Sequence, residues 1–123
     1  MGYTSDVAYV IKFDDIEQRD AFVVLMRAKN DALTTQALDE IGHDDDKDPI
    51  ITFSCESTKW YAGYPDVQVH HRLMARANEL YGASYRFVRI GEDVNDIDIQ
   101  DLDEKGLDLW EYVEPITSIR TSF

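Results

Sequence analysis

Cysteine, long apolar runs and positive charge are all scarce in this chain of 123 residues. A single cysteine, Cys55, cannot form an intramolecular disulfide, which fits a reducing compartment. There is no run of about 18 apolar residues, so we expect no membrane span. The first twelve residues lack the basic start and apolar stretch of a secretory signal. These absences predict a cytoplasmic protein, and the length fits a single domain over residues 1–123.

The shortage of positive charge excludes further classes of partner. Lys and Arg number 12 against 25 Asp and Glu, which gives a formal net charge of -13. A domain that binds nucleic acid directly needs a basic surface, and so does one that docks on anionic lipid. We therefore expect neither direct nucleic-acid binding nor membrane binding. Apolar residues make up 44% of the chain, enough for a core, so the chain is not expected to be disordered as a whole.

Strand-like segments occur along the whole chain. Residues 3–13 are apolar at both odd and even positions, which is typical of a central strand buried on both faces. Residues 91–106 are acidic and are expected to form turns. Further strands are predicted at 50–55, at 84–90, and at 107–113 and 116–121 with a bend at Pro115.

Helix signals lie between the first strands. Asp14 followed by Glu17 resembles a capping box, so a helix should begin there. Asn30 and Asp31 are expected to end that helix and to cap a second one, for which Gly42 is the expected stop.

A third helix is predicted between Pro65, at a natural first helical position, and Gly82. Strands that alternate with helices and then follow one another predict an α+β fold. We expect a single sheet of four to five strands with helices on one face, in a ferredoxin-like or related sandwich.

The acidic residues concentrate in two blocks. The first acidic block spans residues 39–48 and the second spans residues 92–104. In the second block, Val94, Ile97 and Ile99 alternate with the acids, so its apolar side can attach to a core while its carboxylates point to water. Carboxylates fixed in a row can imitate duplex phosphates, which lie roughly 7 Å apart along a strand. This pattern favours a decoy that occupies a basic groove of another protein.

Two simpler interpretations of the acidity stay open. The blocks can be a solvated surface that only keeps the protein soluble. The chain also has 17 Asp against 8 Glu and few lysines, which is typical of adaptation to high salt. Decoy binding weakens as salt rises, whereas a halophilic protein gains stability with salt.

No constellation of residues points to catalysis, so we expect a protein that is not an enzyme and has no metal and no cofactor. Asp44, Asp46 and Asp48 have the opening spacing of a calcium loop, but Pro49 stands where that loop needs glycine. His70 and His71 are neighbours on a helix and point about 100° apart, so one is expected inside and one outside. Cys55 lies in a predicted strand, where cysteines are usually inert.

An aromatic cluster, Trp60, Tyr61 and Tyr64, precedes the third helix. Exposed aromatic side chains often anchor a protein partner. The alternative is that Trp60 packs over the sheet edge and Tyr64 packs against the start of the next helix, which leaves the role of Tyr61 open.

Four short segments resemble small acidic proteins of undetermined function from tailed phages and prophages. They are YTSDVA at 3–8, KWY at 59–61, YPDV at 64–67 and RIGED at 89–93. The resemblance implies action against a host enzyme or host defence, as anti-CRISPR and anti-restriction decoys act, and a location in the host cytoplasm. It carries no catalytic residues.

The leading hypothesis is a non-enzymatic inhibitor that binds a basic, nucleic-acid-contacting surface of a host protein. The alternative is a structural or accessory virion protein that forms a homo-oligomer through its tail, residues 107–123. For the inhibitor, the predicted partner-binding residues are Asp44, Asp45, Asp46, Asp48, Trp60, Tyr61, Glu92, Asp93, Asp96, Asp98, Asp101 and Asp103.

Overall fold

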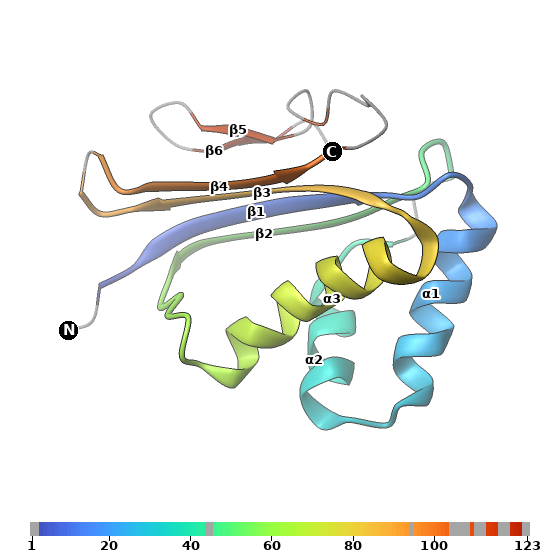
Figure 1. The fold of residues 1–123 in the computed structure, drawn as a ribbon. Coiled ribbons are helices and arrows are strands. Elements are labelled where there is room, and N and C mark those ends of the chain that lie inside the picture. Colours follow the sequence, from blue (N-terminus) through green and yellow to red (C-terminus); the bar gives the residue numbers. More distant parts are fainter. Residues whose placement is uncertain are drawn as a thin grey trace.

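The computed structural model describes residues 3–43, 46–93, 95–103 and 109, together with the backbone of 113–115 and 119–121. Within these ranges the chain forms a sheet, three helices on one side of it and a short hairpin on the other (Figure 1). The elements are β1 (Ser5–Lys12), α1 (Ile16–Ala28), α2 (Ala32–Glu40), β2 (Ile50–Thr58), α3 (Pro65–Tyr81), β3 (Ser84–Gly91), β4 (Ile97–Leu102), β5 (Val113–Pro115) and β6 (Ile119–Thr121).

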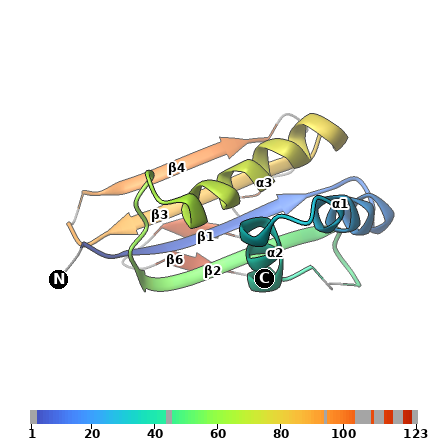
Figure 2. The same cartoon turned by 90° about the horizontal axis from the view of Figure 1, so that it is seen from below.

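The main sheet has the strand order β2-β1-β3-β4, and every neighbouring pair is antiparallel (Figure 2). Because β2 and β3 both run antiparallel to β1, they are parallel to each other, and α3 connects them across the intervening strand. This is a split β-α-β unit, the building block of ferredoxin-like folds. The predicted α+β class, with one four-stranded sheet and helices on one face, is confirmed.

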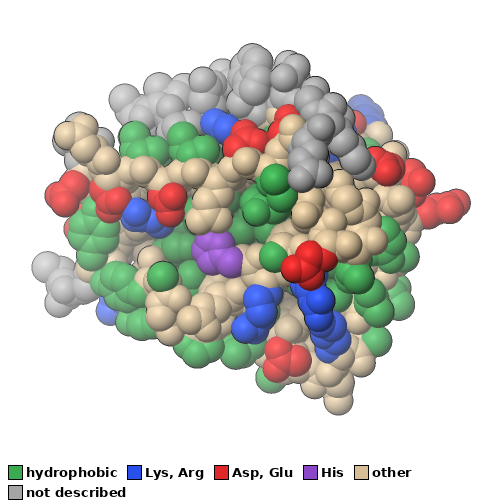
Figure 3. Space-filling model, in the orientation of Figure 1, with side chains coloured by type: hydrophobic (Ala, Val, Ile, Leu, Met, Phe, Trp, Pro, Cys, Tyr) green, Lys and Arg blue, Asp and Glu red, His purple; other side chains and the backbone are tan. Residues whose placement is uncertain are grey.

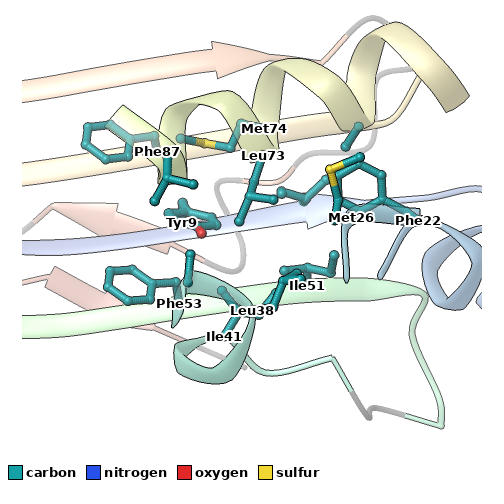
Figure 4. Close-up of a cluster of buried hydrophobic side chains, with 14 of the residues drawn as sticks. Tyr9, Phe22, Met26, Leu38, Ile41, Ile51, Phe53, Leu73, Met74 and Phe87 are labelled. Atoms are coloured by element: carbon teal, nitrogen blue, oxygen red, sulfur yellow. The ribbon is translucent and has the colours of Figure 1, made fainter. Parts of the chain in front are cut away.

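Both faces of β1 are buried, as the apolar pattern of residues 3–13 predicts. On the helix side, Tyr9, Ile51 and Phe87 of the sheet pack against Phe22, Leu38 and Leu73 of the helices (Figure 4). On the opposite side, Ala8, Val10 and Val88 form a second cluster with Leu109. The β5–β6 hairpin lies on that side and contacts β1 and β3 (Figure 1).

The helix boundaries follow the capping residues closely. The cap of α1 is Asp15 rather than the predicted Asp14: its side chain accepts a hydrogen bond from the Gln18 amide (2.8 Å). The capping box lies one residue later than predicted. The side-chain oxygen of Gln18, rather than that of Glu17, accepts a hydrogen bond from the backbone amide of Asp14 (3.3 Å). Asp31 caps α2 through Thr34, as predicted.

Both predicted ends of α3 are confirmed, whereas α2 ends one residue before the predicted stop. Pro65 is the first residue of α3, and Gly82 ends it with a φ of 65°, a left-handed conformation that favours glycine. Ile41, rather than Gly42, ends α2 in extended conformation. Gly42 instead forms a bridge to Thr52 on the outer edge of β2.

Two predictions about the C-terminal third are wrong. Residues 97–102, expected in a turn-like segment, form β4 because Ile97 and Ile99 pair with Ile90 and Val88 of β3. The final strands, predicted to be part of the main sheet, form a separate two-stranded sheet. Most of the predicted strand 107–113 lies outside the described residues.

A polar pair is enclosed in the helix-side core. The Tyr9 hydroxyl and His70 Nδ1 share a hydrogen bond of 2.8 Å, and the His70 ring lies 4.3 Å from that of Phe53. Burial lowers the pKa of His70 from 6.5 to about 4, so the imidazole is neutral in the folded protein at neutral pH. The inward placement expected for one of the two histidines therefore falls to His70.

The pH dependence of stability follows from this pair. The unfolded chain takes up a proton at His70 near pH 6.5, whereas the folded chain does so only near pH 4. The contribution of the neutral His70 to the free energy of unfolding is therefore present above pH 6.5 and is lost as the pH falls toward 4. We expect a loss of about 2 kcal/mol between about pH 7.5 and pH 5, measured by urea unfolding.

The matched control is His70→Asn, which keeps a polar group near Tyr9 but does not titrate. It should lower stability at both pH values and should show a smaller fall between them. An equal fall in the variant and the natural protein would contradict the assignment to His70.

Candidate functional site

The two acidic blocks lie on opposite edges of the sheet. The described part of the first block includes Asp46, which is exposed, and Asp48, which is half-buried, in the loop that leads into β2. The second block forms the β3–β4 turn and β4. Since β1 and β3 separate β2 from β4, the edges are about 14 Å apart. The blocks therefore do not form one continuous row, and the predicted residues Asp44 and Asp45 lie outside the described residues.

The β3–β4 end of the sheet is held by a network around Asp96. Arg89 donates two hydrogen bonds to this carboxylate, of 2.6 and 3.1 Å, and the Tyr3 hydroxyl donates another of 2.6 Å. The Arg89 guanidinium, with Tyr3, lowers the pKa of Asp96 to about 2. The carboxylate is therefore ionised throughout the physiological range.

Neighbouring residues extend this network to the N-terminal segment. Glu92 accepts hydrogen bonds from the amide and the hydroxyl of Thr4, at 3.1 and 2.8 Å. The amide of Asp93 donates to the Tyr3 hydroxyl at 3.0 Å. The acidic turn is thus attached to residues 3–4, nearly ninety positions away in sequence.

The carboxylates of β4 alternate between the two faces of the sheet. Asp98 stands opposite Arg89, on the side of the helices, whereas Asp101 stands opposite Arg86, on the side of the hairpin. Asp101 accepts a hydrogen bond of 2.6 Å from Arg86. Asp103 follows the strand and is half-buried. A flat partner can reach only part of the second block at a time.

On the helix side, the β3–β4 end borders a cavity of about 410 Å³. Acidic side chains gather over this end of the molecule, with a histidine close to them (Figure 3). The cavity brings together residues from the N-terminal segment, the loop before α3, α3 itself, β3 and β4. The lining residues are Tyr3, Trp60, Tyr61, Ala62, His71, Phe87, Arg89, Asp96, Asp98 and Gln100. Trp60, Tyr61, Asp96 and Asp98 among them belong to the predicted site.

The aromatic wall of this cavity is part of the core. Trp60 is only 9% exposed, with its ring 5.8 Å from Phe53 and 5.5 Å from His70. Trp60 therefore packs over the sheet, as the alternative interpretation has it, and it also lines the cavity, so its role in partner binding stays a prediction. Its Nε1 is buried without a hydrogen-bond partner in the part of the chain described, so ring packing holds it. Tyr61 is half-buried and meets Tyr64 edge-on at 5.0 Å.

One carboxylate at the cavity, Asp98, has no direct ion-pair contact among the described residues, although Arg89 on the adjacent strand attracts it. Arg89 and Asp96 neutralise each other. Burial lowers the pKa of His71, although the Asp98 carboxylate opposes that shift. His71 is therefore neutral near pH 7. Within the described ranges Asp98 forms neither a salt bridge nor a side-chain hydrogen bond, so it sets the net charge of the cavity.

The described lining consists of aromatic and acidic side chains with one arginine, one histidine, one glutamine and one alanine. It contains no serine, cysteine, threonine or lysine side chain. The half-buried Cys55 lies elsewhere on β2, and burial raises the pKa of its thiol, which disfavours the reactive thiolate. Among the described residues, no group of three or more His, Cys, Asp or Glu is placed to hold a metal ion. No described helix is long and apolar enough to cross a membrane.

Comparisons with family models, curated proteins and solved structures give no match for this chain. The site therefore rests on its geometry. Sequence reasoning did not find Tyr3, His71, Arg89 or Gln100 as site residues. One pattern in the sequence pointed to Arg89. Arg86 and Arg89 are separated by the same interval as Asp98 and Asp101, and opposite charges favour pairing across neighbouring antiparallel strands.

The close approach at Gly91 gives a test of this network. A Cβ on Gly91 would overlap with the Tyr3 hydroxyl and the Asp96 carboxylate. We expect Gly91→Ala to displace both groups, to lower the free energy of unfolding by about 1–2 kcal/mol and to speed hydrogen exchange at the Asp93 and Asp96 amides.

The matched control is Gly63→Ala, where an added Cβ meets nothing within 4 Å. This variant should keep the stability and exchange rates of the natural protein. Equal behaviour of the two variants would show that the network does not hold the turn.

Proposed function

We propose that the protein is a non-enzymatic inhibitor that binds a basic, nucleic-acid-contacting surface of a host protein in place of nucleic acid. The contact surface is the β3–β4 end, with Asp93, Asp96 and Asp98 beside the cavity. The first acidic block adds to the long-range attraction but lies too far away for the same contact. Phage origin and action against host defence are part of this proposal.

The observation that supports it best is the fixed geometry of the acidic turn. A solvated acidic surface needs no partner for its carboxylates. Here Arg89 and Tyr3 orient the carboxylate of Asp96, and Thr4 orients that of Glu92. Ordering the side chains that hold these carboxylates costs conformational entropy. Oriented charges give a partner a defined pattern to recognise, and charge complementarity governs specificity and association rate.

Exposed apolar side chains alternate with these charges along β4 and face the hairpin side of the sheet, opposite to Asp98 and the cavity. Ile97 and Ile99 of β4 are each 45% exposed. Interfaces combine a small apolar centre with a polar rim, so this edge has the composition of a contact surface. The second candidate, a structural protein that forms a homo-oligomer, was expected to associate through residues 107–123, most of which lie outside the described residues. The exposed edge of β4 offers it a different surface for such association.

The test is capture of bacterial lysate proteins on the immobilised chain. We expect nucleic-acid-binding proteins to be retained at low salt, released at high salt and displaced by added duplex DNA. Asp93→Asn combined with Asp98→Asn should weaken the affinity for the purified captured protein roughly tenfold.

The matched control combines Glu17→Gln with Asp46→Asn, which changes the net charge equally at the other end of the molecule. This variant should bind nearly as well as the natural protein. If both pairs of substitutions weaken binding equally, the partner responds to the net negative charge of the protein and not to the β3–β4 end. A defined multimer in sedimentation, with no DNA-displaced partner, would favour the structural candidate.

A further inference from the structure

We propose that the cavity at the β3–β4 end receives the guanidinium group of one arginine side chain of the partner protein. This inference rests on the proposed function, because it names the chemical group that the acidic surface recognises. The cavity volume of about 410 Å³ lies in the lower part of the range of ligand pockets, about 300–1,000 Å³. One long side chain fits such a space.

The net negative charge of the cavity favours a ligand that carries one positive charge. The Arg89–Asp96 pair is internally neutral, and His71 is uncharged near neutral pH. Asp98 remains as a carboxylate without an ion-pair partner in the described part of the chain. A monocation would give it one, in a site partly shielded from water where such pairing is stronger than at an open surface.

An anion does not fit, although Arg89 lines the cavity. The two terminal nitrogens of its guanidinium donate to Asp96 at 3.1 and 2.6 Å, and one of them also donates to the Ser5 hydroxyl at 3.1 Å. An anionic ligand would have to break these bonds and approach Asp98 as well. The repulsion and the lost hydrogen bonds both oppose it.

The aromatic walls favour guanidinium over ammonium. The rings of Trp60, Tyr61 and His71 all contribute to the lining, although Trp60 is only 9% exposed. Guanidinium is planar, is weakly hydrated and stacks on aromatic rings, whereas ammonium is strongly hydrated. Gln100 offers an additional amide oxygen as an acceptor. Basic grooves that bind nucleic acid use arginine to contact phosphate, so such a partner supplies the group.

The experiment titrates the intact protein with N-acetyl-arginine methylamide and follows the indole N–H of Trp60 and the side-chain amide of Gln100 by NMR. We expect saturable shifts at both groups, with a Kd on the order of 1 mM, as suits a ligand of this size. N-acetyl-citrulline methylamide has nearly the same shape without the charge, and should bind at least about tenfold more weakly.

Variants separate the cavity from the general acidity. Asp98→Asn should weaken arginine binding at least about fivefold, and Tyr61→Leu about threefold. Glu17→Gln removes an equal charge at the other end of the molecule, away from the lining, so it should leave the Kd unchanged. Equal binding of the citrulline compound, equal effects of Asp98→Asn and Glu17→Gln, or shifts elsewhere on the protein would overturn the inference.

The two proposals fail in different ways. If the arginine compound does not bind, but the Asp93 and Asp98 double variant still loses the DNA-displaced partner, the acidic surface acts without the cavity. If the compound binds as expected and no partner is displaced by DNA, the cavity recognises arginine in another setting and the decoy function is wrong.

Discussion

The pairing of Arg89 with Asp96 is the interaction on which the acidic end of this protein depends. A chain with a net charge of -13 repels itself, and the repulsion is greatest where carboxylates follow one another in sequence. At the β3–β4 turn, the Arg89 guanidinium compensates one carboxylate, and Tyr3 binds the same group from the far end of the chain. The turn, the start of β1 and the wall of the cavity are thereby joined in one network.

That network is possible because β1 occupies the centre of the sheet. Its two buried faces separate the helix-side core from the cluster beneath the hairpin, so the strand is fixed by packing on both sides. Tyr3 precedes this strand and Arg89 lies on its neighbour β3, with Ser5 placed opposite Gly91. Apolar packing therefore determines where the polar groups meet, and the polar groups then order the acidic segment.

Much of the fold could be predicted from local patterns in the sequence. The double-sided apolar pattern of residues 3–13 places the central strand, and Pro65 and Gly82 mark the ends of α3. The strand β4 could not be recognised in this way, because aspartate is unfavourable in strands and dominates this segment. What makes it a strand is tertiary: Ile99 pairs with Val88, and Asp101 pairs with Arg86 on the adjacent strand. A charge pattern that looks like a turn in isolation becomes a strand when its partner supplies the opposite charge.

The candidate site was only partly predictable, for a related reason. Acidic and aromatic residues stand out in a sequence, so Tyr61 and Asp98 could be chosen from their surroundings. His71 and Tyr3 are inconspicuous until the fold brings them to the same cavity.

The structure also changes the kind of recognition that the sequence suggested. A row of carboxylates in register with duplex phosphates requires one continuous edge, but Asp98 and Asp101 point to opposite faces of β4 and the first block lies on the other side of the sheet. With the charges dispersed in this way, long-range attraction comes from the whole molecule, whereas short-range discrimination has to come from one place. We propose the cavity beside Asp98 as that place, because it combines a carboxylate that has no direct ion-pair contact in the described residues with an aromatic lining. Under the proposed function, the protein would compete with nucleic acid by binding a single arginine of the groove rather than by reproducing the geometry of the phosphate backbone.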